Sequence, residues 1–437
     1  MTEAAVEGDL GSINPALEGA TASPPRNAWV SSTLAAFDSP IYRLIWLGSF
    51  LGFMAFNMSG TAQSVVAFDI AGNNRAVGTV MFGQGAAMLL LNPFGGTIAD
   101  RLNKRFLLIA TQGVLGAVIL ATAVLIATDL ISIPLLALGA FTTGTMFAFL
   151  GPARASILGD IVPQNRVGNA MALLQVGGNV GRILAPFVAG ALLSWGFIGA
   201  SGTYFIIAGM LIFVLLFMSR IPDVPTRSSE GRSVFADMKL GLAHVRANAR
   251  LTHAIVSYYF VTMLGFSFFV LTPGFVKAEL GRGTAEVGAM LGVAAMGGLL
   301  GSLIVASLAD SMRASVYLRI AGAIGAAGLI AVGFAPSFLL AMFAMVFVGG
   351  GVAAFQTLNN SVALKDTEPA YYGRVMGLMQ VAWGLINLTS LPVGALADLL
   401  GERAVLSGAG VGLICVLVLL TLWERRISSP REVLSGI

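Results

Sequence analysis

Long apolar segments alternate with short polar ones along almost the whole chain. We count twelve such segments, each near the roughly 20 residues that a helix needs to cross the hydrocarbon core of a bilayer. They extend over residues 41–67, 76–99, 106–127, 132–158, 166–194, 202–219, 251–276, 285–309, 315–334, 337–363, 370–398 and 403–423. The pattern predicts an all-α polytopic membrane protein with twelve transmembrane helices.

The composition also favours a membrane protein. Of the 437 residues, 57% are hydrophobic and 11% are charged, whereas a soluble domain carries about 25% charged residues. The single cysteine, Cys415, rules out an internal disulfide, and the two histidines are too few for a histidine-rich metal site. We therefore expect no cofactor and no metal.

The distribution of Lys and Arg predicts the orientation. If the N-terminus is cytosolic, the inner segments hold twenty of these residues and the outer loops hold four, while Arg182 lies within a span. Positive residues concentrate on the cytoplasmic side of membrane proteins. We expect a multi-pass protein of the cytoplasmic membrane with both termini in the cytosol. The net charge of +4 thus reflects contact with membrane lipids and not with nucleic acid.

The polar segments divide the chain into two halves. The longest connection bisects it and contains an amphipathic stretch, Val234 to Val245, which suggests an interfacial helix. We expect a disordered cytosolic N-terminal tail (1–40), a six-helix bundle (41–219), a cytosolic linker with an amphipathic helix (220–250), a second six-helix bundle (251–423) and a cytosolic C-terminal tail (424–437).

The two halves resemble each other in sequence. Asp160-Ile-Val-Pro163 follows the fourth span, and Asp366-Thr-Glu-Pro369 follows the tenth. Both are followed by matching apolar segments, in which Gln175 corresponds to Gln380. Repeated halves in a transporter place the substrate site between them near the bilayer midplane.

A charged motif follows the second span and carries a family resemblance. Its members are a glycine, Gly96, then Asp100-Arg101 and the two basic residues Lys104 and Arg105. The segment resembles the signature between spans 2 and 3 of the major facilitator superfamily. The resemblance implies the major facilitator fold: twelve transmembrane helices in two pseudo-symmetric six-helix bundles.

The same motif suggests a cytosolic gate. A carboxylate is stabilised at a helix N-terminus, so Asp100 could dock on the start of span 11, and Asp310 on the start of span 5. The second copy, Asp310 to Arg313, lacks the adjacent arginine. The alternative is that these charges only set the topology.

The fifth span carries Gly181, Arg182, Pro186 and Gly190. This pattern is similar to the glycine–proline signature of major facilitator antiporters, with alanines at two glycine positions. The wider stretch from Gly151 to Pro186 resembles the branch that includes enterobactin exporters and macrolide-efflux proteins. The resemblance implies export, and proton antiport as the source of energy.

Charged residues within spans are candidates for function because burying them in lipid is costly. Arg182 lies about midway along span 5 and could attract an anionic or acyl-rich substrate, or be satisfied by backbone carbonyls. No acidic residue lies in the middle of a span. Asp69, at the outer end of span 1, is our only candidate for proton coupling, and the alternative for it is a solvated helix-end charge.

In this family spans 1, 4, 7 and 10 line the cavity. The predicted substrate contacts are Asn57, Gln63, Thr142, Phe149, Arg182, Tyr258, Tyr259, Gln356, Asn359 and Asn360. A large, mostly apolar pocket with few hydrogen-bonding groups suits an amphipathic small molecule. Each of these residues could instead serve helix packing.

These observations favour a monomeric secondary transporter that exports a drug, a macrolide or a siderophore by alternating access. A lipid or lysolipid flippase, or an exporter of one metabolite, on the same fold is the alternative. A membrane enzyme is disfavoured because no span carries a catalytic set of residues, and a sensor because neither tail is long enough for an output domain. The chain has no phosphate-binding loop of the kind that nucleotide-driven pumps require.

Overall fold

The computed structural model describes residues 35–163, 166–221, 234–308, 311, 313–368 and 371–427. The first half contains the short η2 (Ala35–Asp38) and then α2 (Pro40–Ala71), α3 (Asn74–Arg101), α4 (Lys104–Ala127), α5 (Ile133–Ile161), α6 (Val167–Ser194) and α7 (Gly199–Ser219). The second half contains α8 (Val234–Ala247), α9 (Ala249–Gly265), α10 (Phe268–Gly274), the π-helical η4 (Phe275–Glu279), α11 (Thr284–Ala306), α12 (Ala314–Phe334), α13 (Phe338–Lys365), α14 (Tyr372–Leu400) and α15 (Glu402–Ile427).

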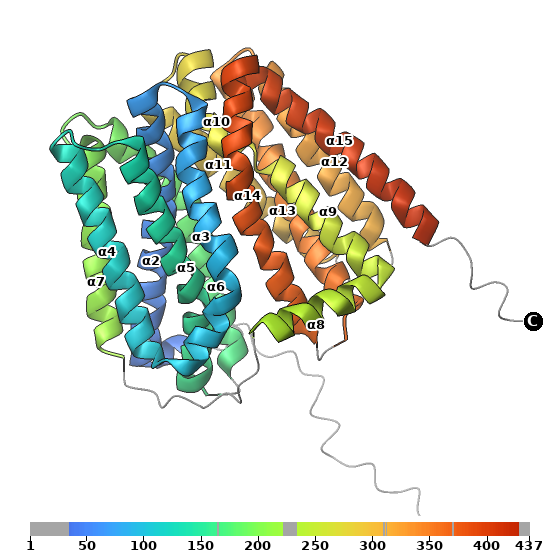
Figure 1. Ribbon diagram of the computed structural model, residues 1–437, viewed down its shortest axis with the longest axis horizontal. Helices are drawn as coiled ribbons and strands as arrows, with labels where there is room; N and C mark the ends of the chain where they lie inside the picture. Colours follow the sequence, from blue (N-terminus) through green and yellow to red (C-terminus); the bar gives the residue numbers. More distant parts are fainter. Residues whose placement is uncertain are drawn as a thin grey trace, which may run out of the picture.

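The predicted fold class is confirmed: twelve long helical spans form two six-helix bundles (Figure 1). Eleven spans in the described part are long and apolar enough to cross a membrane, and α3 is equally long but more polar. The seventh span is not one helix, as the apolar run suggests, but the succession α9, α10 and η4. Pro273 within α10 lacks an N–H and so cannot continue the regular hydrogen-bond pattern.

Local sequence explains where several spans begin. Pro40 lies in the first turn of α2, where its missing N–H costs nothing, and Ser39 accepts a hydrogen bond from the Tyr42 amide. Asn103 caps α4 in the same way, and Asn248 caps α9 with bonds from two amides. These caps fix the points at which the chain leaves each loop and enters the bilayer.

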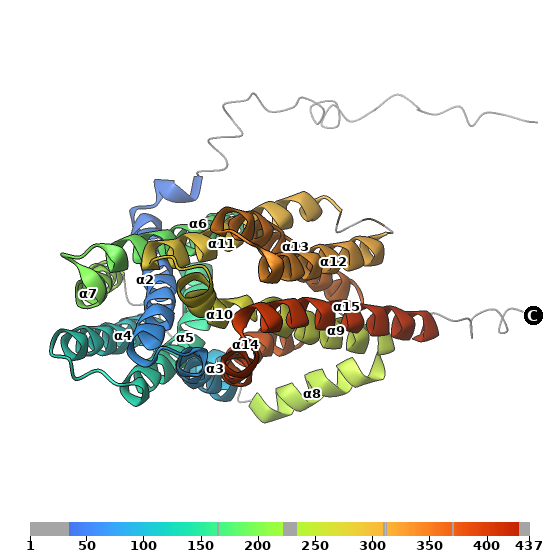
Figure 2. The same ribbon diagram turned by 90° about the horizontal axis from the view of Figure 1, so that it is seen from above.

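The two halves meet along two helix pairs, α3 with α14 and α6 with α11. Seen from above, the halves lie beside each other, and both pairs lie on the boundary between them (Figure 2). The helix α8 lies across one end of the second half, and we call this the linker end (Figure 1). The opposite end, which carries residues 72–73 and Gly401 between helices, is called the far end.

Candidate substrate cavity

A cavity of about 1520 Å³ lies between the two halves. Its walls come from α2, α3, α5 and α6 on one side and from α10, α11, α13 and α14 on the other. The lining reaches Met171, near the start of α6, Arg374, near the start of α14, and Met238 of α8. The cavity therefore extends from the middle of the protein to the linker end.

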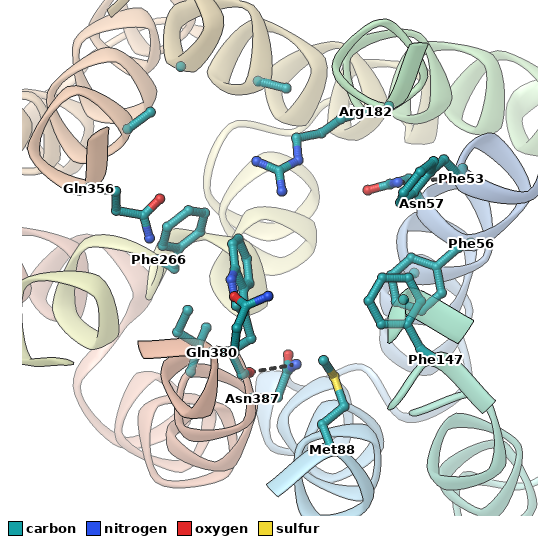
Figure 3. Close-up of a pocket in the computed structure, with 18 of the residues that line it drawn as sticks. Phe53, Phe56, Asn57, Met88, Phe147, Arg182, Phe266, Gln356, Gln380 and Asn387 are labelled. Atoms are coloured by element: carbon teal, nitrogen blue, oxygen red, sulfur yellow. Dashed lines mark hydrogen bonds between the residues drawn. The ribbon is translucent and has the colours of Figure 1, made fainter. Parts of the chain in front are cut away.

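Aromatic side chains cover much of both walls. Phe56 and Phe147 stack in the first half with ring centroids 4.0 Å apart. Phe266 and Trp383 face them from the second half, 5.5 Å apart and tilted. Figure 3 shows Phe56 and Phe147 on one side of the cavity and Phe266 on the other. Such walls can hold planar apolar groups from two sides.

Three arginines line the same cavity, and no Asp or Glu does among the lining residues that the structure describes. Arg182 projects into the open space (Figure 3), with its guanidinium carbon 5.3 Å from the centre of the Trp383 ring. Arg154 lies over Phe53 at 4.5 Å and is 4% exposed. Arg374 lies over Tyr371 at 5.1 Å.

Amide side chains supply most of the remaining polar groups. They are Asn57, Gln84, Asn92, Gln175, Asn179, Gln356, Gln380 and Asn387. Many come from α3, α6 and α14, which line the cavity in addition to the expected spans 1, 4, 7 and 10. The reason is geometric: the helices at the boundary between the halves face the space that opens there.

The predicted contacts fall into two groups. Asn57, Arg182 and Gln356 line the cavity. The other seven are not among the lining residues that the structure describes. Gln63 and Tyr258 are buried at 5% and 4% exposure, and Asn359, Tyr259 and Thr142 donate to the carbonyls of Ala254, Leu378 and Leu138. Phe149 faces a small pocket beside α4, and Asn360 is half-buried.

Span 5 uses its glycines for helix contact. A Cβ added to Gly190 would lie 2.8 Å from the Cα of Gly288 on α11. A Cβ added to Gly181 would lie 3.6 Å from the backbone nitrogen of Met54. Pro186 lies inside α6, where it removes one backbone hydrogen bond, and it also lines the cavity. Arg182 is thus the member of this motif that presents a charge to the cavity.

The residues of the predicted gate are only partly described. Asp310 lies outside the described residues, and for Gly96, Asp100 and Arg101 the structure describes only the helical backbone of α3. Lys104 is 5% exposed, and Arg105 donates to the Ser219 carbonyl at 2.6 Å. Arg313 is exposed just before α12.

Polar contacts close the far end. Asp398 accepts hydrogen bonds from the backbone amides of Asn74 and Arg75, at 2.7 and 2.9 Å, and thereby caps α3 from the other half. Glu402 accepts from Asn74 Nδ2 at 2.8 Å. Asp69, the candidate for proton coupling, forms an ion pair with Lys277 of η4, outside the cavity.

Comparison with known proteins decides the family. The model of the Major Facilitator Superfamily matches residues 45–388. The chain belongs to the major facilitator superfamily. This membership agrees with the two six-helix halves and makes the chain a transporter of the membrane.

Relatives within the major facilitator superfamily are exporters by name. The enterobactin exporter EntS of Escherichia coli O6:K15:H31 (strain 536 / UPEC) is 24% identical over 428 residues, covering 94% of this chain and 99% of its own length. The enterobactin exporter EntS of Citrobacter koseri (strain ATCC BAA-895 / CDC 4225-83 / SGSC4696) is also 24% identical, with the same coverage.

Solved structures share the fold. A bacterial homolog of the human lysosomal transporter Spinster, in an inward-facing and occupied conformation, has a TM-score of 0.71 at 16% identity and covers 92% of this chain and 98% of its own. A POT family transporter in complex with 5-aminolevulinic acid has a TM-score of 0.69 at 13% identity, covering 89% and 96%.

Proposed function

We propose that this chain is a secondary active transporter that exports an amphipathic small molecule across the cytoplasmic membrane by alternating access. The observation that carries the proposal is the cavity of about 1520 Å³ between the halves, which reaches the linker end while hydrogen bonds and an ion pair join the halves at the far end. A site that is accessible from one end only is what alternating access requires. The cavity walls combine aromatic rings, amides and arginines, which suits an amphipathic molecule.

The direction of transport is proposed from orientation and relatives together. The bias of twenty positive residues against four favours a cytosolic position for the linker end. The cavity described here would then accept its substrate from the cytosol. The curated relatives are enterobactin exporters, which favours a siderophore, with drugs and macrolides as further candidates.

Proton coupling forms part of the proposal, with Asp69 as the titrating group. Asp69 lies in the last turn of α2 in the first half, and Lys277 lies in η4 of the second half. Their ion pair therefore joins the halves at the far end. Protonation would remove the charge of Asp69 and weaken this contact. A proton from outside would thereby favour opening at the far end, as an antiporter needs.

We propose that Asp100 forms the corresponding gate at the linker end. The helices α3 and α14 run antiparallel, with Asn74 beside Asp398 and Gly85 beside Asn387. If this antiparallel pairing continues along both helices, the end of α3 lies beside the start of α14. A carboxylate there would stabilise the N-terminus of α14 when the linker end closes.

An accumulation assay tests the export function. The chain is expressed in a bacterial host that lacks its own exporters, and intracellular dyes, macrolides, catecholate siderophores and a fluorescent lysolipid are measured with and without a protonophore. We expect lower accumulation of one of the first three groups, and we expect the protonophore or Asp100→Asn to abolish the difference. Equal accumulation in cells with and without the membrane-inserted protein would overturn efflux, and movement of the lysolipid alone would favour the flippase alternative.

A further inference from the structure

We infer that the cavity selects an organic anion with an aromatic group, and that Arg374, Arg154 and Arg182 mark its route from the linker end to the midplane. The inference rests on the proposed function and specifies its substrate class. It starts from three positive side chains that line one cavity. We call these three residues the arginine series.

Arg182 is the innermost member of the series. It lies about four turns into α6, which at 1.5 Å per residue corresponds to roughly 22 Å from the start of that helix and so to mid-membrane depth. Its guanidinium faces the ring of Trp383, and the structure shows neither an ion pair nor a hydrogen bond between it and any residue in the described ranges. A guanidinium in this environment gains more from an anionic partner than one in water would.

Arg154 lies about two turns before the end of α5, roughly 10 Å from that end. It is almost fully buried, yet its Nη2 has no hydrogen-bond partner among the described side chains and backbone groups. The amide of Gln112 lies next to it above Gly52 and is neutral. The positive charge of Arg154 therefore has no adjacent carboxylate in the described part of the chain and remains available to a ligand.

Arg374 lies in the first turn of α14, at the linker end of the cavity. The three arginines thus occupy successive depths, from the first turn of a helix to the middle of the membrane. Charges of one sign along a low-dielectric cleft concentrate ligands of the opposite sign. The arrangement favours the entry of an anion from the linker end and its binding near Arg182.

The walls beside Arg182 indicate what else the anion carries. Trp383 and Phe266 lie on the second-half side, and Phe56 and Phe147 lie on the first-half side. An aromatic ring of the ligand can stack on these side chains while its charged group pairs with Arg182. An aryl carboxylate can both stack and pair with Arg182, whereas a neutral aromatic amide can stack but carries no charge for Arg182.

A matched pair of ligands tests this inference. The purified protein in nanodiscs is titrated with 1-pyrenebutyrate and with 1-pyrenebutyramide, which share the aromatic body and differ in charge, and binding is followed by fluorescence anisotropy. We expect the carboxylate to bind at least tenfold more tightly, and this preference to shrink as salt is added. Arg182→Gln should remove most of the preference, and Arg182→Lys should keep part of it.

One control variant and one further test variant make the result specific. Arg282→Gln removes an exposed arginine outside the cavity and should change neither affinity. Arg374→Gln, at the linker end, should slow association more than it speeds dissociation. Equal binding of the two ligands by the unaltered protein, or an undiminished preference in Arg182→Gln, would overturn the inference. Export of neutral compounds in the accumulation assay would then leave the proposed function intact, so the two failures can be told apart.

Discussion

The two ends of one helix pair, α3 and α14, differ sharply in how closely they pack. Toward the far end a Cβ on Gly394 would overlap the Asn74 carbonyl, and one on Gly78 would overlap the Ser390 carbonyl. Toward the linker end a Cβ on Gly373 or Gly377 would meet nothing within 4 Å among the described residues. Glycines of the same helix therefore serve backbone contact at one end and face open space at the other.

The second pair, α6 and α11, repeats the difference. Gly190 and Gly288 bring the two backbones together toward the far end. A Cβ added to Gly168, near the linker end of α6, would meet nothing within 4 Å in the part of the chain that the structure describes. Small residues allow helices to approach without a hydrophobic driving force in lipid. In this conformation the glycines of the two pairs therefore bring the halves into closer contact at the far end than at the linker end.

The largest effect should come from blocking contact at the far end. In Gly288→Val the new side chain would overlap the Pro186 carbonyl and the backbone of Gly190. Overpacking of this kind costs about 1–3 kcal/mol, enough to depopulate the present conformation. We expect transport to fall below about a tenth of the wild-type rate, measured as efflux from loaded cells.

Gly408→Ala is the matched control for this variant. Gly408 lies in α15, and its added Cβ would meet nothing within 4 Å. The control should transport at nearly the wild-type rate. If Gly288→Val is equally active and equally abundant in the membrane, close packing of α6 and α11 is not needed for the cycle.

A substitution at the linker end should produce a smaller and different defect. Gly377→Val adds volume where this conformation has room, so ligand affinity should stay within about twofold of wild type. Closure of the linker end would bring α14 against α3, and turnover should therefore fall about tenfold. Binding by the purified protein and efflux from cells measure the two quantities, and a parallel loss of both would contradict this explanation.

The polar contacts at the far end should contribute less than the packing. Asp398→Ala removes three hydrogen bonds that Asn74 and Arg75 donate to the carboxylate. Hydrogen bonds to charged groups contribute about 1.5–3 kcal/mol when buried, and less at this exposed site. We expect cavity residues to become about three- to tenfold more accessible from the far end.

Cysteine labelling measures this shift in accessibility. Because Cys415 is the single native cysteine, a Cys415→Ser background permits one reporter cysteine in the cavity. A membrane-impermeant thiol reagent is then applied from outside the cell. An unchanged labelling rate would show that Asp398 does not hold the far end closed.

The smallest effect should come from the exposed ion pair of Asp69 and Lys277. Exposed pairs contribute about 0–1 kcal/mol, so Asp69→Asn should change far-end accessibility by about twofold or less. If Asp69 also carries the proton, its replacement should flatten the pH dependence of efflux. Lys277→Gln provides the comparison, because it breaks the same pair and leaves the carboxylate titratable.

Several features of the fold follow from the sequence by itself. Twelve apolar runs and the repeated motifs around Asp160 and Asp366 predict twelve spans in two related halves. The structure agrees because a helix in lipid must satisfy its own backbone groups, so length and apolarity nearly determine a span. The break between α9 and α10 escaped this reasoning, since hydropathy does not detect a change of helix within an apolar run.

The site was less predictable than the fold. Arg154 and Arg374, near the inner ends of two predicted spans, counted in the sequence among the positive charges of the cytosolic side, yet both line the cavity. At 29 residues, α5 and α14 are about 43 Å long and exceed the hydrocarbon core. A charge near the end of such a helix can thus belong to the helix and face the cavity.

The sequence determined the number of spans, their division into two halves and the family, because these depend on composition and local order along the chain. Only the tertiary structure decided which side chains share the cavity and which end of the protein is closed. Tyr258 and Asn359 look as suitable for ligand contact as Gln356 does, but the rotation of each helix buries the first two. That rotation depends on packing between residues hundreds of positions apart, such as Asn74 and Asp398.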